Sequence, residues 1–123
     1  MKNFLLISFL FLSSILLSQS VTTKEQVHDF GTVEYGAPCI NEFLIYNEGD
    51  TPVSITQCKP SCRCVLTECP TQEILPGKFT VVTVNYDTKR EGPINKSITL
   101  YLSDPQQPIL ILRIRGNVLK KSE

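Results

Sequence analysis

The chain has 123 residues, with 12 Lys and Arg balanced by 12 Asp and Glu, and it contains five cysteines. This length suits one domain rather than two, and the even charge balance excludes the basic surface on which nucleic-acid binding usually depends. We therefore expect a single domain with no nucleic acid among its partners.

The first twenty residues predict a secretory signal peptide. "MKN" carries one positive charge, residues 4–17 form an uncharged apolar run, and Ser18 and Ser20 stand at the minus-three and minus-one positions of a cleavage site. The alternative is a membrane anchor, but the run is shorter than the roughly 20 residues that span a bilayer. We expect cleavage of residues 1–20, which leaves residues 21–123 as a secreted or periplasmic domain without a stable membrane anchor.

The remaining chain alternates apolar and polar residues, which predicts β-strands because successive side chains of a strand point to opposite faces. A first strand is expected at "QVHDFGTV", residues 26–33. The later strands are expected at "EFLIYN", "PVSIT", "TVVTVNYDT", "KSITLYL" and "ILILRIRGNV". The residues that share one face of a strand are Phe43 and Ile45; Val53 and Ile55; Val82, Val84 and Tyr86; Ile98, Leu100 and Leu102; and Leu110, Leu112 and Ile114.

Turn-forming residues separate these strands, in "NEGDTP", "LPG", "DTKREGP", "SDPQQP" and "GN". Glycine supplies positive φ, and proline presets a turn. Strands that recur every 8–12 residues or so between such turns indicate a sandwich or a barrel. About seven strands in a domain of about 100 residues predict an all-β fold, an immunoglobulin-like antiparallel β-sandwich.

Several short motifs occur in a fixed order along the chain: "HDFGTV", "FLIYNEG", "PVSI", "PSCRC", "LPG", "VNYDTKREGPINKSITL" and "LRIRGNV". In these motifs the chain resembles the bacterial family catalogued as domain of unknown function 1573. The resemblance covers nearly all of residues 21–123. It implies an exported bacterial β-sandwich with no established activity.

The chain departs from the family pattern around its cysteines. The family's paired cysteines usually flank a glycine, where this chain has Arg63. If the site requires positive φ, Arg63 is strained; otherwise the local turn differs. Cys58 stands where the family favours an aliphatic residue, which suggests partial burial, and Cys39 and Cys69 look like additions.

Four cysteines lie within twelve residues, in "CKPSCRCVLTEC": Cys58, Cys62, Cys64 and Cys69. An exported chain meets an oxidising environment, in which close cysteines tend to pair. We therefore expect structural disulfides. Four cysteines allow three pairings, and the sequence does not choose among them. Cys39 is the expected free thiol if the four pair with one another.

Two other interpretations of the cluster stay open. A zinc or copper site, with Cys62 and Cys64 as its candidate ligands, needs a bent loop, because two residues of a straight strand hold their thiols too far apart for one metal ion. A redox role is favoured by Lys59 and Arg63, because positive charge lowers the pKa of a thiol. No thioredoxin-like pattern surrounds the cysteines.

The sequence predicts no enzyme. His28 is its one histidine, and no pair of carboxylates stands out for acid–base chemistry. We expect a non-catalytic binding or structural module of the bacterial cell envelope, with no cofactor and with an unidentified protein or envelope partner. The alternative is a thiol-based metal-binding or redox protein that uses the cysteine cluster 58–69.

Overall fold

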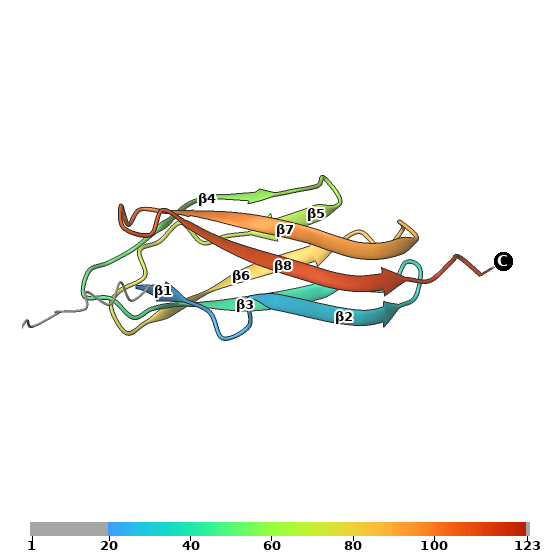
Figure 1. Ribbon diagram of the computed structural model, residues 1–123, viewed down its shortest axis with the longest axis horizontal. Helices are drawn as coiled ribbons and strands as arrows, with labels where there is room; N and C mark the ends of the chain where they lie inside the picture. The colour runs from blue at the N-terminus through green and yellow to red at the C-terminus, as the bar shows by residue number, and fades with distance from the viewer. Residues whose placement is uncertain (1–19, 123) are drawn as a thin grey trace, which may run out of the picture.

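The computed structural model describes residues 20–122, which form two stacked β-sheets (Figure 1). Their strands are β1 (Val21–Thr22), β2 (Val27–Val33), β3 (Ile40–Asn47), β4 (Ile55–Pro60), β5 (Val65–Glu68), β6 (Phe79–Tyr86), β7 (Gly92–Leu102) and β8 (Ile109–Val118). The predicted all-β sandwich is confirmed. Apart from Ser20, the predicted signal peptide lies outside the described residues. Residues 20–122 contain no helix that is long and apolar enough to cross a membrane.

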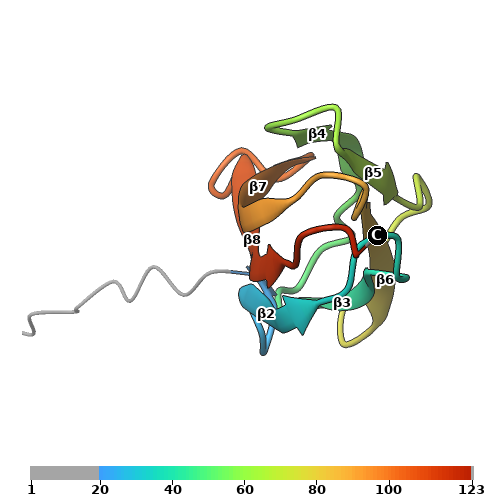
Figure 2. The same ribbon diagram turned by 90° about the vertical axis from the view of Figure 1, so that its right-hand side faces the viewer.

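The two sheets have the strand orders β1-β3-β6-β5 and β2-β8-β7-β4. We call them the β3–β6 sheet and the β7–β8 sheet. The end view in Figure 2 shows β4 and β5 together at one side of the sandwich, and β2 beside β3 at the other. All neighbouring strands run antiparallel except β2, which is parallel to β8. The predicted antiparallel pattern therefore fails at this one pair, because the chain leaves β1 and joins the opposite sheet as β2.

The core lies between the sheets and consists of the residues that the alternation grouped together. Within β6, Val82 and Val84 are fully buried, and so are Ile98 and Leu100 of β7. The other grouped residues are also buried: Phe43, Ile45, Val53, Ile55, Tyr86, Leu102, Leu110, Leu112 and Ile114. The predicted strand phases are therefore confirmed. Burial of these apolar side chains is the main favourable contribution to folding.

The region between β3 and β6 differs from the sequence prediction. Val53 forms only an isolated bridge with Ile74, and the backbone N–H of Ser54 donates to the Ser103 hydroxyl instead of a neighbouring strand. The strand begins at Ile55 and continues through Cys58 to Pro60. Proline is accepted there because β4 is an edge strand of its sheet. The short strand β5 was not predicted.

Asn47, at the end of β3, organises the turn that follows it. Its side chain is buried, and its amide donates to the carbonyls of Thr51 and Ile74, each at 2.8 Å. Its Oδ1 accepts from the N–H of Gly49 at 3.0 Å. Side-chain hydrogen bonds of Asn47 therefore shape this turn, and Gly49 has no positive φ. The buried amide satisfies its own polar groups and connects β3 to the segment before β6.

We expect Val84→Asp to destabilise the fold by about 3 kcal/mol or more, because it places an unpaired charge in the core. The matched control is Thr83→Lys. Thr83 faces the other side of β6, opposite Glu42 on β3 and Glu68 on β5. A lysine there meets two carboxylates, so the free energy of unfolding should change by less than about 0.5 kcal/mol. Urea unfolding of the oxidised protein measures both, and equal losses would contradict the assigned strand phase.

Candidate functional site

The cysteine cluster spans β4, β5 and the loop between them, residues 61–64, which passes from one sheet to the other and is called the β4–β5 loop here. After Pro60 the chain turns through residues 61–64 and enters β5. The N–H of Ser61 donates to the carbonyl of Ser97 at 2.8 Å, and the N–H of Val65 donates to the carbonyl of Cys62 at 3.2 Å. The β4–β5 loop is therefore bent. Such a bend is needed to bring Cys62 and Cys64 together.

Cys58 and Cys69 form a disulfide that joins the two sheets. Cys58 lies on β4, the edge strand of the β7–β8 sheet, and Cys69 directly follows β5, the edge strand of the β3–β6 sheet. Their Cα atoms are 6.5 Å apart, and both side chains pack against the core. Closure of a loop of this length contributes about 3 kcal/mol of stability in the chain-entropy account. This bridge stabilises the side of the sandwich at which the two edge strands meet.

Cys62 and Cys64 form a second disulfide across a single residue, with a Cα–Cα distance of 5.1 Å. Cys64 is buried, whereas Cys62 is partly exposed. The backbone N–H of Cys64 donates to the Cys62 sulfur at 3.1 Å. A loop of three residues gains only about 1.5 kcal/mol from closure. This bridge therefore contributes less to global stability than the bridge between Cys58 and Cys69.

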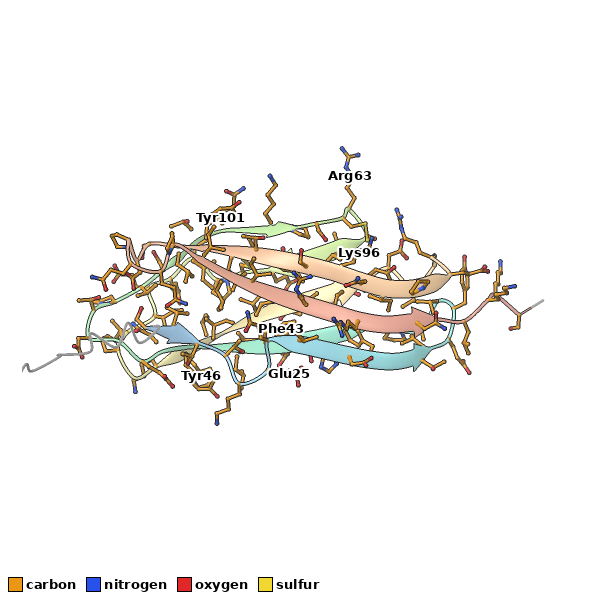
Figure 3. The ribbon with its side chains drawn as sticks, in the orientation of Figure 1. Glu25, Phe43, Tyr46, Arg63, Lys96 and Tyr101 are labelled. Carbon is orange, nitrogen blue, oxygen red and sulfur yellow. A yellow bond between two sulfur atoms is a disulfide. The ribbon has the colours of Figure 1, made fainter. Side chains whose placement is uncertain are left out.

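Arg63, between these two cysteines, is exposed and projects away from the sandwich (Figure 3). No residue other than glycine has positive φ among residues 20–122. Arg63 is therefore unstrained, and the local turn differs from one that requires glycine.

Cys39 is a free thiol within the described part of the chain, and it is buried just before β3. Its carbonyl accepts from the N–H of Tyr86 at 2.9 Å. Burial raises the pKa of the Cys39 thiol above its ordinary value. Burial also raises the pKa of the Tyr86 phenol. The nearby Arg90 lowers this pKa, whereas Asp87 and Cys39 raise it. Both groups are consequently neutral at neutral pH, and Cys39 is protected from alkylation in the folded state.

An open groove of about 430 Å³ lies beside the β4–β5 loop, at one end of the sandwich. It is lined by residues from three segments: Gly36, Ala37, Pro38; Arg63, Cys64, Leu66; and Asn85, Tyr86, Asp87, Thr88, Lys89. Hydrogen bonds hold these segments together. The Thr88 hydroxyl donates to the carbonyl of Ala37 at 2.6 Å, and the N–H of Asp87 donates to the carbonyl of Cys64 at 2.9 Å. The groove therefore has a defined shape and presents charges of both signs.

The sequence did not reveal this groove, although it did place turns at some of its segments. Asp87, Thr88 and Lys89 fall in the turn motif "DTKREGP", and nothing in the sequence shows that they meet the β4–β5 loop.

The four clustered cysteines are brought together, whereas Cys39 belongs to the core. Within residues 20–122, no group of three or more His, Cys, Asp or Glu side chains is arranged to hold a metal ion. In the oxidised state the Cys62 and Cys64 sulfurs are bonded to each other.

His28 lies on β2, away from the cysteines. Its Nδ1 lies 2.5 Å from a carboxylate oxygen of Glu25, and its ring packs edge-on against Phe30 at a centroid distance of 4.6 Å. The side chain is partly buried. Its contacts are those of a strand residue that packs at the margin of the sandwich.

The family described as "Protein of unknown function (DUF1573)" matches residues 21–118. No curated protein matches the chain. Among solved structures, the chain is similar to a protein of unknown function from Porphyromonas gingivalis W83, with 19% identity and a TM-score of 0.69. This match covers 79% of the chain and 46% of the Porphyromonas protein, so the chain spans less than half of that protein.

Two further structures share the fold. The ASH/PapD-like domain 7 of human CEP192 matches with 14% identity and a TM-score of 0.65, over 86% of this chain and 89% of that one. The VesB protease of Vibrio cholerae matches with 13% identity and a TM-score of 0.66, over 80% of this chain and 32% of the protease. At these identities the likeness establishes the fold alone.

The two bridges should differ in their effect on stability. Replacing Cys58 and Cys69 together with serine should lower the free energy of unfolding by about 3 kcal/mol, because the joined loop is long. The double replacement of Cys62 and Cys64 should cost about half as much. Urea unfolding monitored by circular dichroism measures both variants. Equal losses would show that the bridge between the edge strands has no special role.

Proposed function

The chain belongs to the DUF1573 family of proteins of unknown function, and from this premise we propose that it is an exported bacterial protein, a non-catalytic binding or structural module of the cell envelope. The family description names no activity, so the proposal rests on the chain's own residues. The observation that carries it is the pairing of four cysteines into two disulfides. Such bridges form and persist in oxidising compartments and are rare in the cytosol.

The N-terminal sequence supports export independently of the cysteines. Its positive start, apolar run and small residues at the cleavage point have the three-part order of a secretory signal peptide. Cleavage after Ser20 would make Val21 the first residue of the domain. The Val21 N–H already donates to Oε1 of Gln107 at 2.9 Å. The Asp104 carboxylate, which accepts from the Ser20 hydroxyl at 2.5 Å, would then lie near the new N-terminal ammonium group.

A binding role is supported by the groove beside the β4–β5 loop. Loops held by a rigid scaffold are where sandwich domains commonly bind their partners. Here three segments form the groove, and the hydrogen bonds from Thr88 and Asp87 fix their relative positions. Arg63, Asp87 and Lys89 provide charges of both signs. This mixture suits a protein or envelope partner better than a nucleic acid, which requires an excess of positive charge.

The hydrogen bond from the Cys64 N–H to the Cys62 sulfur favours a second candidate function, thiol–disulfide exchange. After reduction, this N–H would stabilise a thiolate at Cys62. In such an exchange a partner dithiol is oxidised to its disulfide. Its two electrons and two protons pass to Cys62 and Cys64, whose S–S bond breaks to give two thiols. Loss of partner oxidation in the Cys62→Ser, Cys64→Ser double variant would identify this activity.

Export is tested by expressing the full chain with a C-terminal tag in a bacterium. We expect mature protein in the periplasmic fraction or the medium, with a new N-terminus at Val21. Denatured without reductant, it should show one alkylatable thiol per chain; native protein should show none, because Cys39 is buried. Cytoplasmic protein with five thiols and an intact N-terminus would contradict export. Stoichiometric copper or zinc by elemental analysis would instead support the metal-binding alternative.

A further inference from the structure

Strand β3 has a backbone edge that its neighbours leave largely uncovered. On one side β3 pairs with β6 from Ile40 to Tyr46. On the other side β1 pairs only with Tyr46 and Asn47, because β1 has two residues. The chain then leaves this sheet and joins the opposite one as β2. Residues 40–45 therefore form a free edge of the β3–β6 sheet, on the side opposite the disulfide between the edge strands.

The free edge presents the backbone groups of alternate residues. The Cys39 carbonyl accepts from Tyr86, and the Asn47 N–H donates to the carbonyl of Lys78, so the odd-numbered residues of β3 bond toward β6. The N–H and C=O groups of Ile40, Glu42 and Leu44 consequently point away from β6. Such a row of unpaired donors and acceptors is a template for one more strand.

A small groove runs along this edge, between β3 and the segment that leads from β1 to β2. Its volume is about 180 Å³, and its lining includes Asn41, Phe43 and residues 23–25. Figure 3 shows Glu25 and Phe43 near each other in this part of the molecule. The Asn41 Nδ2 atom is the one buried side-chain nitrogen or oxygen without a hydrogen-bond partner in residues 20–122. An unpaired buried donor is unfavourable, and an acceptor that entered the groove would satisfy it.

The side chains on the outer face of this edge indicate the partner's sequence. Ile40 is 55% exposed and Leu44 is 39% exposed, with the exposed Glu42 between them. If two copies of the chain paired antiparallel about Glu42, the two carboxylates would face each other, which is unfavourable. A basic residue opposite Glu42 is favourable for the same reason. Pairing about Glu42 therefore disfavours a second copy of the chain and favours a segment that places a basic residue at this position.

We propose that residues 40–44 of β3 bind an extended segment of another exported protein, which adds to the β3–β6 sheet as a further strand. The segment has the pattern apolar–x–basic–x–apolar: Lys or Arg faces Glu42, and the apolar residues face Ile40 and Leu44. It also supplies an oxygen acceptor to Asn41. Recognition by strand addition combines main-chain hydrogen bonds with side-chain contacts at alternate positions. This inference rests on the proposed function as a binding module and names its partner's chemistry.

The test uses the oxidised mature protein and a synthetic nonapeptide, Thr-Thr-Val-Thr-Lys-Thr-Val-Thr-Thr. Amide hydrogen exchange and NMR titration should show slowed exchange at Ile40, Glu42 and Leu44. A matched peptide with Glu in place of Lys should bind at least tenfold more weakly, and Glu42→Lys should reverse this preference. Unchanged exchange at these three amides at millimolar Lys peptide would overturn the proposal.

Two further variants separate binding from folding. Leu44→Pro removes an outward N–H while leaving the bonds to β6 in place, as proline permits on an edge, so it should abolish peptide binding in a folded protein. Asn41→Leu removes the unpaired donor, so it should raise the melting temperature and weaken peptide binding severalfold. If Leu44→Pro leaves peptide binding unchanged, the peptide binds elsewhere and the proposal fails.

Sedimentation of the mature protein tests whether a second copy of the chain binds at this edge instead. A monomer is expected, whereas a dimer that Leu44→Pro dissociates would show that the edge binds a second copy, which contradicts the proposal. Failure of the peptide experiments in a protein that is still exported with both disulfides would remove this inference and leave the proposed function standing.

Discussion

The covalent bond between Cys58 and Cys69 is the constraint on which the side of the sandwich formed by β4 and β5 depends. Two stacked sheets are otherwise held by the packing of their inner faces. This bridge joins their edge strands, β4 and β5, where the sheets meet. The short strand β5 contributes few apolar contacts of its own, since Leu66 is largely exposed. The bridge compensates for this by closing a loop in the unfolded chain and by holding β5 against the core in the folded one.

The two sides of the sandwich consequently differ. On the side with the disulfide between Cys58 and Cys69, the carbonyl of Cys64 accepts from the N–H of Asp87. This hydrogen bond connects the β4–β5 loop to the loop after β6, and a groove forms between them. On the other side, the chain divides its first strands between the sheets and leaves β3 with a free edge. The side with the disulfide has a groove of defined shape, and the side with the free edge of β3 has unpaired backbone groups. Both features are part of the basis for the proposed binding role.

The sequence predicted the parts of the fold that depend on local alternation. Val82, Val84, Ile98 and Leu100 were grouped correctly because each strand buries one face and exposes the other. Strand β5 was missed because it has only four residues and its pairing with β6 is a tertiary contact that no local pattern reports.

The site was less predictable than the fold. The four clustered cysteines identified the region, but their pairing depends on which strands become neighbours, and three pairings were equally allowed. The groove is formed by segments far apart in the sequence, so its lining residues looked like ordinary turns. Asn41 carries no sequence signal at all, because an unpaired donor is defined only by what surrounds it.

The covalent link between the two sheets can be checked by disulfide mapping of the protein isolated from its native compartment. The protein is digested without reduction, and the linked peptides are fragmented in a mass spectrometer. We expect Cys58 to be bonded to Cys69 and Cys62 to Cys64, with Cys39 free. A different partner for Cys58, or four reduced cysteines in the cluster, would contradict the claim that a covalent bond joins the two sheets.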